Sequence, residues 1–150
     1  METQEEFTYK QAPYPNHPNN YRITCFDVNK AYAGHIWFEV RPRKLVLHYV
    51  GVKKQYRRKH IGSTLLHKME DFAKKNHIYH IEGKFDPVNE KPEEKLDLKL
   101  KPTRRFYEYN GYTVPNAEHS WANYDETWTL YKDLDPTVLY QTNQMEEKSK

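Results

Sequence analysis

The sequence VKKQYRRKHIGSTLL, residues 52–66, indicates a strand that leads through a basic turn into a helix. A run rich in valine and leucine, residues 45–52, precedes five lysines and arginines that fall within seven positions, residues 53–59. An amphipathic pattern with helical spacing then begins at Ile61 and continues to about Lys75. Unpaired N–H groups at a helix start, the positive end of the helix dipole and nearby cations together favour phosphate or pyrophosphate. The segment therefore predicts a phosphate site where the turn meets the helix.

The composition narrows the class of protein. A chain of 150 residues is the size of a single domain with one hydrophobic core. No apolar stretch approaches the roughly 18 residues of a membrane span, and the acidic start METQEEF is followed by no hydrophobic segment, so neither a membrane helix nor a signal peptide is predicted. The single cysteine, Cys25, excludes an internal disulfide and a cysteine-built zinc site. We therefore expect a cytoplasmic protein without a membrane partner or a metal.

The charge favours anionic ligands without identifying one. The formal net charge is +3, which is too small to indicate nucleic acid by itself. The thirteen tyrosines are expected to supply core volume, although the same rings stack on bases in some proteins. A basic, tyrosine-rich nucleic-acid-binding module thus stays open as one alternative.

The rest of the chain predicts a mixed α+β domain built from strands around one long helix. Strands are predicted over residues 21–28, 31–40, 45–52, 78–85, 112–114 and 127–130, and helices over residues 61–75 and 103–110. Gly111 is expected to end the second helix. Three regions are expected to lack regular structure: a flexible N-terminal arm over residues 1–20, a charged loop over 86–101 and a polar tail over 135–150. The domain itself then spans residues 21–134.

Two segments carry a resemblance to a known family. Residues 52–66 resemble the acyl-CoA-binding motif of the Gcn5-related N-acetyltransferase (GNAT) superfamily, V-x-P-x-[YF]-[RQ]-x-x-G-x-[GA] followed by x-x-L-L. The positions in register are Val52, Tyr56, Arg57, Gly62, Leu65 and Leu66. Lys54 stands where the motif has proline, and His60 stands at its first glycine. Residues 106–112, FYEYNGY, are similar to the family's F-Y-E-x-x-G-F/Y signature.

The resemblance covers residues 21–132 and implies both a fold and an activity. The implied fold is a mostly antiparallel central sheet with a long helix after the acyl-CoA-binding strand and a short second helix. The implied reaction is transfer of acetyl from acetyl-CoA to a primary amine of a protein, peptide or metabolite in a ternary complex. The family usually places two acceptor-side helices early in the chain, whereas residues 1–44 here predict only an arm and strands. We therefore expect an open acceptor side, which suits a protein lysine, an N-terminus or a large metabolite.

The resemblance also implies which residues bind the cofactor. Pyrophosphate would be held by Arg57 and by the backbone of Arg58, Lys59, His60, Ile61, Gly62 and Ser63. A strand bulge near Gly51 would free backbone groups of Val50 and Val52 for the pantetheine arm and the acetyl oxygen. The alternative for residues 53–59 is a solvated basic turn.

Two residues are candidates for acid–base chemistry. Glu82 lies in an I-E-G-K context similar to the L-E-V-R strand that carries the general base in some family members; a surface glutamate is the alternative. His80 shares its face by the two-residue period, and a water chain without a dedicated base is also possible. Tyr107 matches the family's general acid, which protonates the coenzyme A thiolate, and a core tyrosine is its alternative. A GNAT-like domain that binds a ligand or a protein without turnover is the alternative to an enzyme.

Overall fold

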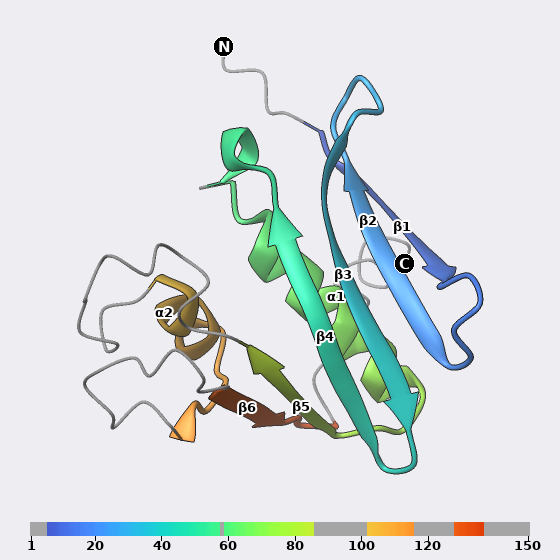
Figure 1. The fold of residues 1–150 in the computed structure, drawn as a ribbon, viewed down its shortest axis with the longest axis vertical. Coiled ribbons are helices and arrows are strands. Elements are labelled where there is room, and N and C mark those ends of the chain that lie inside the picture. Colours follow the sequence, from blue (N-terminus) through green and yellow to red (C-terminus); the bar gives the residue numbers. More distant parts are fainter. Residues whose placement is uncertain (1–5, 58, 86–101, 116–127, 137–150) are drawn as a thin grey trace, which may run out of the picture.

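A six-stranded sheet with one long helix against one face forms the centre of the molecule (Figure 1). The computed structural model describes residues 6–57, 59–85, 102–115 and 128–136. The strands follow one another across the sheet in chain order: β1 Thr8–Pro13, β2 Asn20–Phe26, β3 Tyr32–Arg41, β4 Lys44–Val52, β5 His80–Phe85 and β6 Trp128–Asp133. The helices are α1 Ile61–Lys75, α2 Pro102–Tyr109 and the short 3-10 helix η1 Lys54–Tyr56. The predicted mixed α+β class and mostly antiparallel sheet are confirmed.

The core lies between α1 and strands β2, β3 and β4. Leu65, Leu66 and Met69 of α1 are fully buried, because their spacing places them on one side of the helix. They belong to the same buried cluster as Ile36 and Phe38 of β3. Each such side chain contributes about 1.5–3 kcal/mol when it leaves water. The helix predicted over residues 61–75 is confirmed, and its N-terminus is fixed in place by this packing.

Strands β4 and β5 pair over only part of their length. They are parallel, and the pairing joins Leu45–Leu47 to Ile81–Gly83. β4 then continues to Val52 with β3 as its partner, while β5 diverges from it (Figure 1). Among the described strands, none pairs with the other edge of β4 beyond Leu47. The chain passes from this open edge through η1 into α1.

The bulge in β4 lies earlier than predicted. Phe38 is opposite Leu47 and Trp37 is opposite Tyr49, so His48 is the extra residue. The prediction of a bulge near Gly51 is therefore wrong by three residues, since a bulge of this kind does not require glycine. The bulge reverses the alternation of side chains, so the later residues of β4 are redistributed between the two faces of the sheet.

Three further predictions are corrected. Residues 8–13 were expected in a flexible arm but form β1, which pairs with β2 and packs the partly buried Tyr9 against the core. Pro13 and its neighbours argued against a strand in the sequence, but proline is compatible with an edge strand, and β1 lies at the edge of the sheet. Residues 112–114 form only an isolated bridge, between Thr113 and Tyr131, because Gly111 at φ 89° ends α2 beside β6. The strand predicted over 127–130 continues to Asp133.

The face of the sheet opposite α1 carries no helix from the described residues that precede β4 (Figure 1). Residues 6–43 form strands and turns, in line with the prediction that the segment before residue 45 holds strands. The predicted loop over residues 86–101 and the tail beyond residue 136 lie outside the described residues. In the part of the chain that is described, no helix combines the length and the apolar character needed to cross a membrane.

Candidate active site

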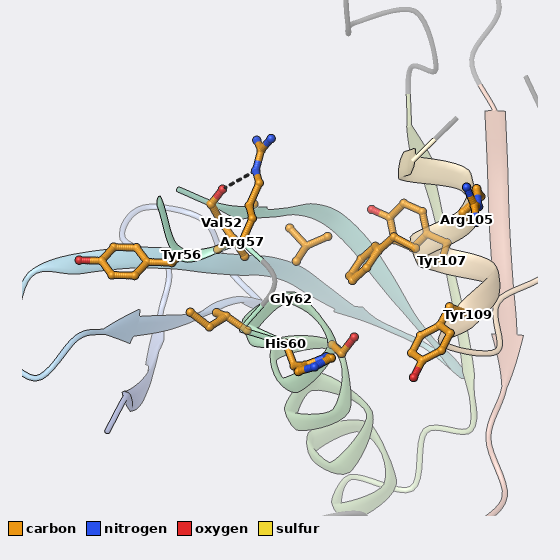
Figure 2. A pocket seen from close by; sticks show the side chains of 13 residues that line it. Val52, Tyr56, Arg57, His60, Gly62, Arg105, Tyr107 and Tyr109 are labelled. Atoms are coloured by element: carbon orange, nitrogen blue, oxygen red, sulfur yellow. Dashed lines mark hydrogen bonds between the residues drawn. The ribbon is translucent and has the colours of Figure 1, made fainter. Parts of the chain in front are cut away.

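A cavity of about 730 Å³ lies between the end of β4, the N-terminus of α1 and helix α2 (Figure 2). The predicted site residues that line it are Val50, Val52, Arg57, His60, Ile61, Gly62, Ser63 and Tyr107. Lys59 does not line the cavity, and Arg58 lies outside the described residues. The described lining includes two arginines and a histidine but no acidic side chain. The cavity therefore has the charge that an anionic ligand requires.

The start of α1 has the geometry of an anion site. Thr64 donates its N–H to the carbonyl of His60 at 3.0 Å, which is the first hydrogen bond of the helix. The N–H groups before Thr64 have no carbonyl four residues back within the helix, so they are available to a ligand. The positive end of the helix dipole adds to their attraction for phosphate.

His60 occupies the position where the motif has glycine, and its backbone explains that preference. It adopts φ 59° and ψ 21°, a left-handed conformation that glycine takes without strain. Histidine is one of the few other residues enriched in this region. The backbone path of the motif is therefore kept in spite of the replacement, while an imidazole is added to the cavity wall.

The basic turn is tied to the body of the protein by Tyr56. Its hydroxyl donates a hydrogen bond to Asp27 Oδ2 at 2.5 Å, and the ring points away from the cavity (Figure 2). This hydrogen bond and those from nearby backbone N–H groups hold the pKa of Asp27 below its ordinary value. Arg57 donates from Nε to the Val52 carbonyl at 3.4 Å. Tyr56 thus fixes the turn, and Arg57 stands at the cavity.

Gly62 and Ser63 join α1 to α2. A Cβ on Gly62 would lie 3.0 Å from two atoms of the Phe106 ring. Asn110 donates from Nδ2 to Ser63 Oγ at 3.1 Å. Glycine at position 62 therefore lets the second helix pack directly against the start of the first, a role that the sequence motif alone did not indicate.

Tyr107 is both a core residue and a wall of the cavity. Its side chain is 6% exposed, and its ring makes edge contacts with Phe106 and Tyr112 at 5.3 and 6.0 Å between centroids. Burial raises the pKa of the Tyr107 hydroxyl, and the neighbouring Tyr49 raises it further. The hydroxyl therefore keeps its proton at neutral pH, as a general acid must.

Three lining residues on α2 were not predicted as site residues, Arg105, Phe106 and Tyr109, and two of them, Arg105 and Tyr109, carry polar groups into the cavity wall. Arg105 and Tyr109 are four residues apart, so they share one side of the helix. Tyr109 is 81% exposed, which is unusual for a large aromatic side chain, and Arg105 adds a cation. Their spacing in the predicted helix 103–110 was the signal that could have identified them.

Glu82 and His80 do not lie at this cavity. They line a second cavity, of about 770 Å³, on the sheet face opposite α1. Glu82 Oε1 is 3.1 Å from Lys44 Nζ and 3.7 Å from His80 Nε2, while His80 Nδ1 is 2.7 Å from Asp133 Oδ1. Glu82 is opposite Val46, far from the end of β4. A role for either residue as the base stays a prediction.

Comparison with solved structures places this architecture among acetyltransferases. PaiA N-acetyltransferase from Thermoplasma acidophilum, in complex with coenzyme A, is 21% identical with a TM-score of 0.58, over 77% of this chain and 61% of that one. Gcn5 from Tetrahymena is 15% identical with a TM-score of 0.60, over 83% and 74%. Ard1 from Thermoplasma volcanium is 14% identical with a TM-score of 0.57, over 76% and 70%. At these identities the likeness shows the fold, and the chain spans less than two thirds of the PaiA structure.

The sequence itself supplies the family. No curated protein matches the chain. The family model described as acetyltransferase (GNAT) family matches residues 1–91, more than half of the chain, including the strand, basic turn and helix that build the cavity. The chain therefore belongs to the GNAT family of acetyltransferases.

Proposed function

We propose that the chain is an acetyl-CoA-dependent N-acetyltransferase that acts on a primary amine of a protein, peptide or metabolite, in the cytoplasm. One observation carries the proposal. A single cavity combines an anion-binding helix start, the open edge of β4 and a buried, protonated tyrosine. These are the parts needed to hold a pyrophosphate, an extended pantetheine arm and a departing thiolate.

The described residues fit coenzyme A as a ligand. Arg57 and the backbone N–H groups of residues 60–63 would hold the pyrophosphate. The sequence predicts the same role for the backbone of Arg58 and Lys59. The edge of β4 beyond Leu47, at Val50 and Val52, has no described strand partner on the β5 side and would pair with the pantetheine arm. Arg105 and Tyr109 would contact the nucleotide end from α2, because both line the same cavity.

In the proposed reaction a neutral amine attacks the acetyl carbonyl carbon directly. The N–C bond forms, the C–S bond breaks and the thiolate takes a proton from the Tyr107 hydroxyl. A thiol with an ordinary pKa of about 8.5 is a stronger acid than a buried tyrosine, so this proton transfer is uphill and its benefit is modest. The amine is expected to arrive from the sheet face that no described helix covers, which leaves room for a large acceptor. The sequence predicts Glu82 as the base, with His80 as second candidate. Neither residue lines the cavity.

Mass spectrometry of candidate acceptors tests the proposal. The protein is incubated with acetyl-CoA and one acceptor at a time: spermidine, a lysine-containing peptide, a peptide with a free N-terminus or nourseothricin. Nourseothricin is included because an acetyltransferase of that name shares the fold. We expect one of these amines to gain an acetyl group only when protein and acetyl-CoA are both present. Binding of acetyl-CoA without transfer to any acceptor in such a panel would favour the domain that binds without turnover. If acetyl-CoA neither binds to the protein nor acetylates any acceptor, the cavity is not a cofactor site.

A further inference from the structure

The sheet face opposite α1 places an imidazole and a phenol at the end of β4. His35 of β3 lies directly opposite Gly51 of β4 in the antiparallel register. Side chains of directly opposed residues lie on the same face of a sheet. A Cβ on Gly51 would overlap the Tyr49 hydroxyl, so that hydroxyl lies over Gly51. The His35 and Tyr49 rings are 4.8 Å apart between centroids.

This pair adjoins the cofactor cavity through the open edge of β4. Gly51 lines the cavity, and Val50 and Val52 point to the helix side of the sheet because they oppose the residues flanking His35. Tyr49 is close enough to Tyr107 to raise its pKa. A thioester lying along Val50–Val52 would therefore lie in the cavity that Tyr107 lines, with His35 and Tyr49 on the face of β4 opposite the Val50 and Val52 side chains.

The His35 ring is held in one orientation by its own strand. Its Nδ1 shares a hydrogen bond with the Tyr32 hydroxyl, and the two rings are 5.7 Å apart between centroids. When Nδ1 carries the proton and donates to the Tyr32 oxygen, Nε2 keeps its lone pair. The hydrogen bond thus holds the ring in place, and in this tautomer Nε2 can accept a proton.

The surroundings of His35 favour the neutral imidazole. Burial lowers its pKa, and Arg22 on β2 lowers it further. The other titratable groups that face it are Tyr32 from β3 and Tyr49 from β4, and Lys53 Nζ lies 5.7 Å from the centre of the Tyr32 ring. Of these neighbours, Arg22 is the cation that opposes protonation of the ring. His35 is therefore available as a base at neutral pH.

We propose that His35 accepts the proton of the attacking amine, that Tyr49 lines the approach of the amine and that Tyr32 orients the imidazole. The proposal rests on the acetyl transfer proposed above. As the N–C bond forms, the amine nitrogen becomes cationic and passes a proton to His35 Nε2. The C–S bond breaks, the thiolate takes the Tyr107 proton, and solvent then removes a proton from His35 and returns one to Tyr107. The balance is one amine and one acetyl-CoA for one amide and one free thiol.

The position of Glu82 explains why the role falls to His35. Glu82 is opposite Val46, five residues before Gly51, and each strand residue advances about 3.3 Å. Its carboxylate is also engaged with Lys44 at 3.1 Å. His35, by contrast, is directly opposite Gly51, which lines the cavity.

The first test is turnover of His35→Gln with spermidine and poly-L-lysine as acceptors. We expect kcat to fall about 10²-fold at neutral pH, with the loss shrinking as pH approaches the amine pKa of about 10, and partial rescue by added imidazole. The melting shift caused by acetyl-CoA should stay unchanged. His17→Gln, which alters an exposed histidine near Trp37, is the matched control and should turn over normally. A His35→Gln enzyme with the parent kcat and pH profile would overturn the proposal.

The second test does not depend on the acceptor. Histidine resonances are recorded by NMR with and without acetyl-CoA, and the His35 ring signal is assigned by its loss in His35→Gln or, if that variant does not fold, by its shift in Tyr32→Phe. We expect acetyl-CoA to move the His35 signal and leave the His17 signal in place. A stationary His35 signal in protein that acetyl-CoA stabilises would refute the role of His35. Failure of acetyl-CoA to stabilise the protein at all would instead refute the proposed function.

Discussion

The left-handed backbone at His60 gives a prediction whose size follows from the structure. An L-residue in this conformation costs about 1–2 kcal/mol, and glycine removes that cost but loses about 0.5–1 kcal/mol through chain flexibility. His60→Gly should therefore stabilise the protein by roughly 0.5–1 kcal/mol. For a domain of this size the melting temperature should rise by about 1–4 °C in calorimetry.

The chain offers a matched control at the other end of α1. His77 also adopts φ 59°, is exposed and follows the C-cap residue Asn76. His77→Gly should give a similar gain in stability with no effect on the ligand, whereas His60→Gly should change acetyl-CoA affinity by no more than about threefold, less than 1 kcal/mol. If His60→Gly lowers the melting temperature while His77→Gly raises it, backbone strain does not determine the contribution of residue 60 to stability. A tenfold loss of affinity in His60→Gly alone would mean that the imidazole, not the backbone, holds the phosphates.

Three further variants probe the site. Arg57→Ala should weaken acetyl-CoA binding by about 1.5–3 kcal/mol, the contribution of a charge-assisted hydrogen bond, while Lys54→Ala on the adjoining 3-10 helix should change calorimetric affinity little; equal losses would indicate a diffuse charge effect. Tyr107→Phe should lower turnover about 10²-fold and the stability by no more than about 1.5 kcal/mol. The pKa of Tyr107 is higher in the folded state, so the stability that its titration contributes is complete below about pH 10 and is lost as pH rises further. In denaturant titrations between about pH 9 and 11, the Tyr107→Phe variant should therefore lose less stability than the parent. Glu82→Gln should leave kcat within about twofold of the parent, because its carboxylate is paired with Lys44; a loss of about 10²-fold or more would restore it as the base.

Local signals were sufficient for most of the fold. The helical spacing of Ile61, Leu65, Leu66 and Met69 located α1, and Gly111 located the end of α2. The edge strand β1 was missed because its side chains are mostly exposed and its pairing with β2 is made by the backbone, which leaves little pattern in the sequence. The position of the bulge was missed for a related reason, because nothing in the sequence around His48 distinguishes a bulged residue from its neighbours.

The two halves of the site differ in how well the sequence predicts them. The phosphate side is local, within residues 52–66, so a motif was enough to gather its residues at one cavity. The catalytic side depends on strand register and on the gap between β4 and β5. The period of two placed Glu82 and His80 on one face correctly, but only the register showed that Glu82 is level with Val46 and that His35 is level with Gly51.

The central claim is that the cavity between β4, α1 and α2 binds acetyl-CoA, and a thermal melt tests it most directly. At a ligand concentration of about 100 times the dissociation constant, binding adds about 2.7 kcal/mol, or roughly 5–11 °C in melting temperature. We expect this rise with acetyl-CoA and with coenzyme A, and a smaller one with ATP, which lacks the pantetheine arm. A melting temperature that neither form of coenzyme A raises would contradict the account.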